Sequence, residues 1–190
     1  MELLKERILK EGKVLPGDIL KIDSFLNHQV DTKLMAEIGQ EFRKIFVDIK
    51  PTKILTVEAS GIPVAITASA YFDYCPVIFA KKNRAYNLSS DVYSSSEKSY
   101  TRGNMNTIQI SKNYLTKDDK VLILDDFIAN GEACLALIDI CRQAGCEILG
   151  VGSVVCKTYQ DGINKIRNAG VDVKCLAYIS SMDNGIINFE

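Results

Sequence analysis

The clearest indication of the architecture comes from residues 121–133, which read Val121-Leu122-Ile123-Leu124-Asp125-Asp126-Phe127-Ile128-Ala129-Asn130-Gly131-Glu132-Ala133. The four apolar residues at the start predict a buried strand, because strands covered on both faces are rich in Val, Ile and Leu. Two adjacent acids, Asp125 and Asp126, follow at the carboxyl end of that strand. A turn of small residues then opens a helix, and open α/β sheets bind ligands at such junctions. The stretch therefore predicts an α/β fold with a ligand site beside the two acids.

The turn Ala129-Asn130-Gly131 is a candidate anion site. Its backbone N–H groups stand at a helix N-terminus, where the helix dipole favours a phosphate. Gly131 permits a close approach of the ligand or a positive φ. Two carboxylates would repel a bare anion, so the ligand should also offer hydroxyl groups. A ribose 5-phosphate meets both conditions, because Asp125 and Asp126 accept hydrogen bonds from its 2- and 3-hydroxyls while the turn holds its phosphate.

The rest of the chain alternates between strands and helices. A strongly periodic helix begins at Asp31 or Thr32 and ends before Pro51, where proline stops it. Further apolar runs predict strands at residues 54–57, 76–80, 148–156 and 174–180, and helices at residues 2–11, 62–70, 132–143 and 163–168. This order favours a mostly parallel central sheet flanked by helices. The length of 190 residues fits one domain over residues 1–190.

One polar segment, residues 83–104, departs from this alternation. Long polar segments inside compact domains are uncommon unless they are lids, binding loops or disordered. A solvated hairpin is the simpler interpretation, since Val92-Tyr93 and residues 107–110 can pair. Both interpretations stay open, because a lid is often a mobile hairpin.

Composition limits the classes of protein. The chain has 23 Lys+Arg against 24 Asp+Glu, so it has no global basic field that would attract nucleic acid. We expect no membrane span, because no apolar run approaches about 20 residues, and no signal peptide, because residues 1–7 are charged. Six cysteines without a C-x-x-C pair predict reduced thiols and a cytoplasmic protein. With His28 as the single histidine, a dedicated metal site is not expected.

Residues 121–133 resemble the phosphoribosyl pyrophosphate (PRPP) motif of type I phosphoribosyltransferases: four hydrophobic residues, two acids and a small-residue phosphate loop. The commonest form of that loop contains threonines, which this chain lacks, so backbone amides and Asn130 would do most of the phosphate binding. The resemblance spans nearly the whole chain. It implies that family's fold, with a flexible loop and a small N-terminal hood over the base, formed by about residues 1–30 and C-terminal residues.

The resemblance also implies roles for residues at the ends of the other strands. The loop after residues 54–57 would hold the pyrophosphate through backbone amides and a hydroxyl, whereas the residues alone equally fit a capping turn with Ser60 as N-cap. Lys81 would reach the pyrophosphate. The implied catalytic residues are Asp125 and Asp126, and the implied PRPP-binding residues are Glu58, Ala59, Ser60, Gly61, Lys81, Ala129, Asn130, Gly131, Glu132 and Ala133.

For the base, the resemblance implies that Lys157 faces the 6-oxo group of a purine. Leu20 would form an apolar wall, and the amide of Asn27 would donate to a 2-oxo group, which suits xanthine. The residues implied to close over the leaving group are Tyr93, Ser94, Ser99 and Tyr100.

The activity implied is transfer of the phosphoribosyl group of PRPP to N9 of xanthine, with Mg²⁺ carried by the pyrophosphate and a homodimer as the assembly. Hypoxanthine or guanine as the base is the nearest alternative. A PRPP-sensing regulatory protein of the same fold is a second alternative. A methyltransferase or dinucleotide binder is a third, although it needs a G-x-G-type loop after an early strand, which is missing.

Overall fold

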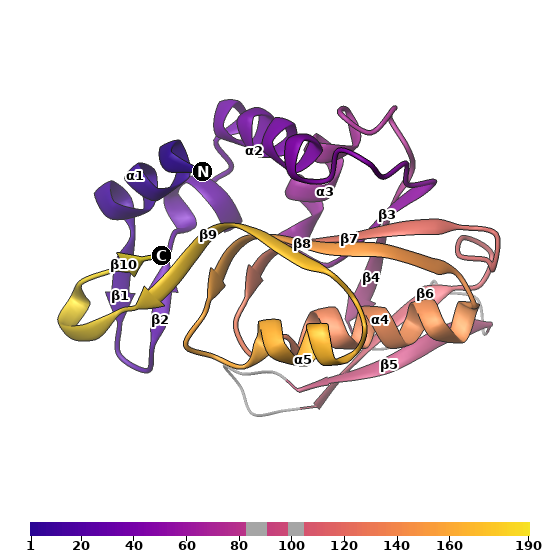
Figure 1. The fold of residues 1–190 in the computed structure, drawn as a ribbon. Helices are drawn as coiled ribbons and strands as arrows, with labels where there is room; N and C mark the ends of the chain where they lie inside the picture. Colours follow the sequence, from indigo (N-terminus) through magenta and orange to yellow (C-terminus); the bar gives the residue numbers. More distant parts are fainter. Residues whose placement is uncertain (83–90, 99–104) are drawn as a thin grey trace.

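A computed structural model describes residues 1–82, 91–98 and 105–190 (Figure 1). Its main sheet is eight-stranded, in the order β10-β9-β8-β7-β3-β4-β6-β5. The five strands from β9 to β4 run parallel, and β10, β6 and β5 add antiparallel edges. The bounds are β3 (Lys53–Val57), β4 (Val77–Lys82), β5 (Val92–Lys98), β6 (Met105–Ser111), β7 (Lys120–Ile128), β8 (Glu147–Lys157), β9 (Val173–Ser181) and β10 (Asn188–Phe189). The mostly parallel sheet predicted from the sequence is confirmed.

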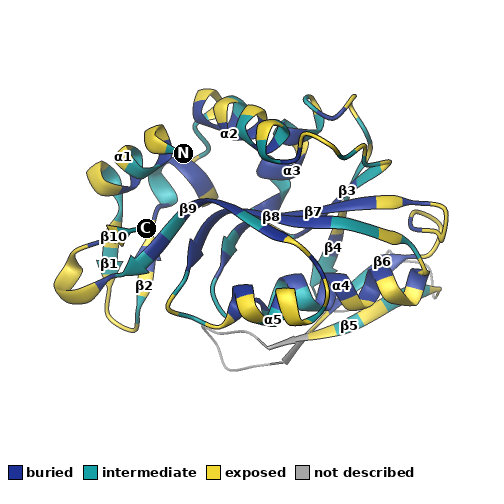
Figure 2. Ribbon diagram, viewed as in Figure 1, coloured by how far each residue is buried: buried dark blue, intermediate teal, exposed yellow. Residues whose placement is uncertain are grey.

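Helices cover both faces of this sheet (Figure 1). α2 (Thr32–Ile45) and α3 (Gly61–Ser69) lie on one face, and α4 (Glu132–Ala144) and α5 (Gly162–Asn168) lie on the other. Successive residues of a strand point to opposite faces, so Leu122 packs in the core under α2 and α3 while Ile123 packs in the core under α4. The central strands β3, β7 and β8 are buried over most of their length (Figure 2), which explains their continuous apolar runs.

The N-terminal segment, residues 1–30, packs beside β9 and β10 at one end of the sheet (Figure 1). It contains α1 (Glu2–Glu11), the hairpin of β1 (Lys13–Leu15) and β2 (Ile19–Lys21), and the π-helical turn η1 (Asp23–Asn27). A short 3-10 turn, η2 (Asp183–Gly185), precedes β10. The amino group of Met1 donates to the carbonyl of Leu176 at 2.6 Å, and the ammonium of Lys5 donates to that of Glu190 at 3.0 Å. The segment is thus attached to the C-terminal part of the chain.

Two of the predicted elements end at clearly different residues in the structure. β7 continues through the two acids to Ile128, because β8 is long enough to pair with it as far as Cys156. The acids therefore lie within the last part of the strand, not after it. α2 ends at Ile45 instead of near Pro51, and the backbone of Phe46 already leaves helical geometry at φ −110°, ψ 48°.

Part of the polar segment forms a hairpin. β5 pairs antiparallel with β6, with Tyr93 opposite Ile110, and β6 pairs with the end of β4. The side-chain amide of Gln143 on α4 donates to the carbonyl of Ser94 at 2.8 Å. Tyr93 and Ser94 thus lie on a strand attached to α4, and Ser99 and Tyr100 lie outside the described residues.

No helix in the described part of the chain is long and apolar enough to cross a bilayer.

Candidate active site

The two acids of β7 lie at the carboxyl ends of the parallel strands. Asp125 is 4% exposed and Asp126 is 7% exposed. The backbone N–H of Asp126 donates to Oδ1 of Asp125 at 2.9 Å, and the hydroxyl of Ser60 donates to Oδ1 of Asp126 at 2.9 Å. The acids are therefore connected to the loop that follows β3.

The electrostatic setting of Asp125 is unfavourable for its charged form. Burial raises the pKa of Asp125 well above its ordinary value, and the neighbouring charge of Asp126 raises it further. The backbone N–H of Asp126 and the positive charge of Lys82 lower this pKa, but they do not compensate for burial. Two adjacent carboxyl groups of this kind are suited to a ligand that brings hydroxyl donors or positive charge.

Ser60 occupies the N-cap position of α3, but its hydroxyl does not bond the helix. It donates to Asp126 instead, so the simple capping turn is not what the structure contains. Gly61, the next residue, has no room for a side chain, because an added Cβ would overlap Oγ1 of Thr56 and lie 3.0 Å from Oδ1 of Asp125. The loop is thus packed directly against the acids, with its backbone at the strand ends.

Glu58 begins this loop, and its side chain has a structural partner. Its Oε1 accepts the backbone N–H of Lys82 at 2.6 Å, and this joins the ends of β3 and β4. The peptide bond between Glu58 and Ala59 is cis. Lys81 and Lys82 point to opposite faces of β4: Lys81 lines a pocket of about 590 Å³ beside β4 and β6, whereas the charge of Lys82 acts on Asp125. Lys82 is therefore the lysine whose charge acts on the acids, and the sequence predicted no role for it.

The turn after β7 has the predicted backbone. Gly131 is left-handed at φ 78° and is the N-cap of α4, without a side-chain cap. It packs against Gly162 at the start of α5, where a Cβ on Gly162 would overlap the carbonyl of Ala129 and lie 2.8 Å from the Gly131 nitrogen. Glu132, the first residue of α4, forms an ion pair of 2.8 Å with Lys165 of α5. The positive charge of Lys165, which lies outside the turn, thus balances the negative charge of Glu132.

Lys157, the last residue of β8, is buried with 4% exposed. Its ammonium contacts the backbone carbonyl of Asp18, lies 3.4 Å from Oδ2 of Asp18, and lies 5.6 Å from the centre of the Phe127 ring. Burial lowers the pKa of Lys157, and the charge and hydrogen bond of Asp18 oppose that shift. Leu20, two residues after Asp18, is buried on β2.

The structure brings Ser60 and Gly61 together with the two acids, but it places Lys81 beside another pocket and leaves Asn27 aside. Asn27 is exposed at the end of η1, and no polar contact between described residues connects it with Lys157. Conversely, sequence reasoning assigned no role to Asp18 or Phe127. Phe127 follows Asp126 directly and offered a local signal, whereas Asp18 was visible only as a turn residue after Pro16-Gly17.

The parallel sheet with two acids between two backbone loops defines a phosphoribosyltransferase fold. Residues 23–190 match the family described as "Phosphoribosyl transferase domain", and the chain belongs to that family. It is 54% identical to the xanthine phosphoribosyltransferase of Ruminiclostridium cellulolyticum, over 100% of this chain and 99% of the relative. It is 50% identical to xanthine phosphoribosyltransferase 1 of Clostridium perfringens, with 100% of both chains covered.

Solved structures support the same fold. The adenine phosphoribosyltransferase of Giardia lamblia complexed with 9-deazaadenine has a TM-score of 0.78 at 20% identity, covering 94% of this chain and 98% of that chain. The Trypanosoma brucei enzyme in complex with AMP, pyrophosphate and ribose-5-phosphate has a TM-score of 0.76 at 18% identity, covering 92% of this chain and 79% of that chain.

Proposed function

We propose that the protein transfers the 5-phosphoribosyl group of PRPP to N9 of xanthine, giving xanthosine 5′-monophosphate and pyrophosphate in purine salvage. The single observation that carries this proposal is the position of Asp125 and Asp126, buried between the loop of Ser60 and the turn of Gly131. The choice of xanthine is supported by the relatives of that name, which are about half identical over the full chain.

In this proposal the two acids bind the ribose. They accept hydrogen bonds from the 2- and 3-hydroxyls and place negative charge near C1, where the displacement develops positive charge. Such a reaction depends on positioning and electrostatic stabilisation. The turn of residues 129–133 holds the 5-phosphate, and the loop of residues 58–61 holds the pyrophosphate, with Lys81 or Lys82 beside it. Tyr93 and Ser94 of β5 close over the leaving group and exclude water.

The proposal includes Mg²⁺, carried by the pyrophosphate of PRPP. The available donors fit this role, because Mg²⁺ is usually bound by one or two carboxylates together with substrate phosphates. Asp125 and Asp126 supply the carboxylates, and no cluster of three or more ligating side chains occurs in the described part of the chain. When bound, the ion would neutralise charge on the departing pyrophosphate.

The N-terminal segment is proposed to form the hood over the base. Its β1–β2 hairpin reaches Lys157 through Asp18, which supports a base site between that hairpin and the end of β8. In this site the ammonium of Lys157 donates to the 6-oxo group, Leu20 forms the apolar wall, and Asn27 donates to the 2-oxo group after a movement of η1.

We also propose that the protein is a homodimer in the cytoplasm. Ile66 on α3, Phe79 on β4 and Tyr114 after β6 are all at least 40% exposed, and a second copy of the chain would cover them. None of the six cysteines forms a disulfide, as expected in a reducing compartment. The molar mass from light scattering tests the dimer, with Phe79→Asp expected to give monomers and the exposed Leu9→Asp to leave the mass unchanged.

The decisive experiment measures pyrophosphate release from PRPP and Mg²⁺ with xanthine, guanine, hypoxanthine and adenine in turn. We expect the largest kcat/KM with xanthine. A larger value with guanine or hypoxanthine would overturn the choice of base and favour the nearest alternative. PRPP binding without turnover of any purine would overturn the enzymatic proposal and favour the regulatory one.

A further inference from the structure

Asp18 is the centre of a polar cluster that joins two distant parts of the chain. It lies in the turn between β1 and β2, at a left-handed φ of 61°, and its side chain is 34% exposed. The Tyr159 hydroxyl donates to Oδ1 of Asp18 at 2.7 Å, and the Gln160 amide donates to Oδ2 at 2.7 Å. With Lys157, three side chains from the end of β8 and the residues after it converge on one residue of the N-terminal segment.

The contact with Asp18 stabilises the charged form of Lys157. Its side chain is only 5% exposed, and a buried ammonium is costly unless it is paired and hydrogen-bonded. Among the described residues, Asp18 is the acid within salt-bridge distance of that ammonium. An ammonium has three N–H donors. The carbonyl and the carboxylate of Asp18 accept two of them, which leaves one for a ligand atom in the proposed base site.

We propose that Asp18 is a positioning residue for the purine: it holds the Lys157 ammonium in place and fastens the N-terminal segment over the base. This inference rests on the proposed function and deepens it. Asp18 does not act on the ribose or the pyrophosphate, because its contacts lie at the end of β8 and not at the loops beside Asp125.

The cluster also determines specificity. A fixed donor at Lys157 favours binding of a purine that has a hydrogen-bond acceptor at C6. It disfavours a purine with an amino group there, because two facing donors leave both groups unpaired. Without Asp18, the Lys157 side chain is free to move or to lose its proton. The preference for a 6-oxopurine over adenine should therefore fall together with affinity for the base.

The experiment compares the wild type with Asp18→Ala and Asp18→Asn in steady-state kinetics. We expect Asp18→Ala to raise KM for xanthine about 10- to 100-fold, as for a lost hydrogen bond to a charged group, and to leave KM for PRPP within about twofold. For Asp18→Asn, KM for xanthine should lie between the values of the wild type and Asp18→Ala. The amide oxygen of Asn still accepts hydrogen bonds but carries no charge. The discrimination against adenine should fall in the same order.

The matched control is Asp23→Ala, which removes a half-buried acid from the same segment, paired with Lys21 at 3.2 Å. It should leave both KM values unchanged. Calorimetric titration with PRPP and with xanthosine 5′-monophosphate supplies a readout besides turnover: only affinity for the nucleotide should fall in Asp18→Ala.

Three outcomes would overturn the inference: an unchanged KM for xanthine in both Asp18 variants, an equal rise of both KM values, or the same effect from Asp23→Ala. Failure of the wild type to turn over any purine would instead overturn the proposed function. If Asp18→Ala does not fold, Asp18→Asn alone decides between these outcomes.

Discussion

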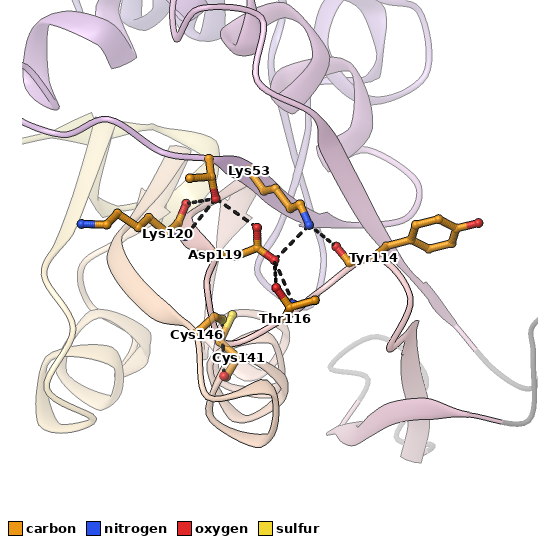
Figure 3. A network of polar contacts seen from close by, with 8 residues as sticks. Lys53, Tyr114, Thr116, Asp119, Lys120, Cys141 and Cys146 are labelled. Carbon is orange, nitrogen blue, oxygen red and sulfur yellow. Dashed lines mark hydrogen bonds and ion pairs between the residues drawn. The ribbon is translucent and has the colours of Figure 1, made fainter.

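Two buried aspartates near opposite ends of β7 have opposite electrostatic settings. Asp119, just before the strand, accepts hydrogen bonds from Lys53 at 2.9 Å, from Thr52 at 3.1 Å, and from the backbone N–H of Thr116 at 2.8 Å (Figure 3). Asp125, near the other end, accepts the N–H of Asp126 and faces that residue's negative charge. Burial alone therefore does not determine how an aspartate behaves in this sheet.

The pKa directions express the same difference. Burial opposes the charged form of Asp119, but hydrogen bonds from Lys53 and Thr116 outweigh it and lower the pKa of Asp119. Burial raises the pKa of Asp125, and its polar neighbours do not compensate. The amino end of the strand is satisfied internally, which stabilises the sheet. At the carboxyl end, the setting of Asp125 stays unfavourable for its charged form, as is usual for functional sites.

The largest expected effect is on activity and comes from the carboxyl end of β7. The double substitution of Asp125→Asn with Asp126→Asn should lower kcat/KM for PRPP by at least about 10³-fold, because both acceptors of the ribose hydroxyls lose their charge. Steady-state kinetics measures this, with the exposed Asp139→Asn of α4 as control. Full activity of the double variant would refute the role of the acids.

The next largest effect is on stability and comes from the amino end of β7. Asp119→Ala should lower the free energy of unfolding by about 2 kcal/mol, because it leaves donors of Lys53 and Thr116 unpaired, while kcat stays unchanged. Denaturant unfolding measures it, and the exposed neighbour Asp118→Ala is the control. The lowered pKa of Asp119 gives stability above about pH 3.9 that is lost as the pH falls through its folded pKa; a variant as stable as the wild type at pH 7 contradicts this.

Asp125→Asn should act in the opposite direction on stability. A raised pKa gives stability below about pH 3.9 that is lost as the pH rises through the folded pKa, so the wild type carries a cost at neutral pH. Removing the charge while keeping an acceptor for the Asp126 N–H should add on the order of 1 kcal/mol, or about 2–4 °C in Tm. Thermal unfolding at pH 7 and pH 4 tests this. A Tm of Asp125→Asn below that of the wild type at pH 7 would contradict the contrast between Asp125 and Asp119. An equal gain in Tm at pH 4 and pH 7 would contradict it as well.

The smallest effect concerns the balance of charge in the phosphate turn. Lys165→Ala should raise KM for PRPP about two- to fourfold, because partly exposed ion pairs contribute at most about 1 kcal/mol and Glu132 is left uncompensated. Adding Glu132→Ala should restore the wild-type KM. A double variant worse than Lys165→Ala would show that Glu132 helps to bind the substrate.

Much of the fold and of the geometry around Asp125 and Asp126 could be predicted because the signals are local. Residues 121–133 contain the strand, the acids and the turn in one stretch, and Gly131 has the positive φ that such a turn favours. The end of β7 was placed too early, because its length depends on pairing with β8, which no local pattern reports.

The proposed base site was harder to predict because its parts are distant in the chain. Asp18 and Lys157 are 139 residues apart, and no spacing rule connects a turn residue with a lysine at a strand end. Family resemblance indicated Lys157 and Leu20 but not Asp18, and the exposed position of Asn27 follows from the geometry of η1.

The contact between Gly131 and Gly162 has a consequence for protein engineering. Each backbone fills the space that a side chain of the other would need, so the two positions form a single unit of design. A threonine-containing phosphate loop grafted from another phosphoribosyltransferase would have to arrive with the first turn of its own α5. Libraries that vary residues 129–133 should therefore hold Gly162 fixed or exchange both segments together.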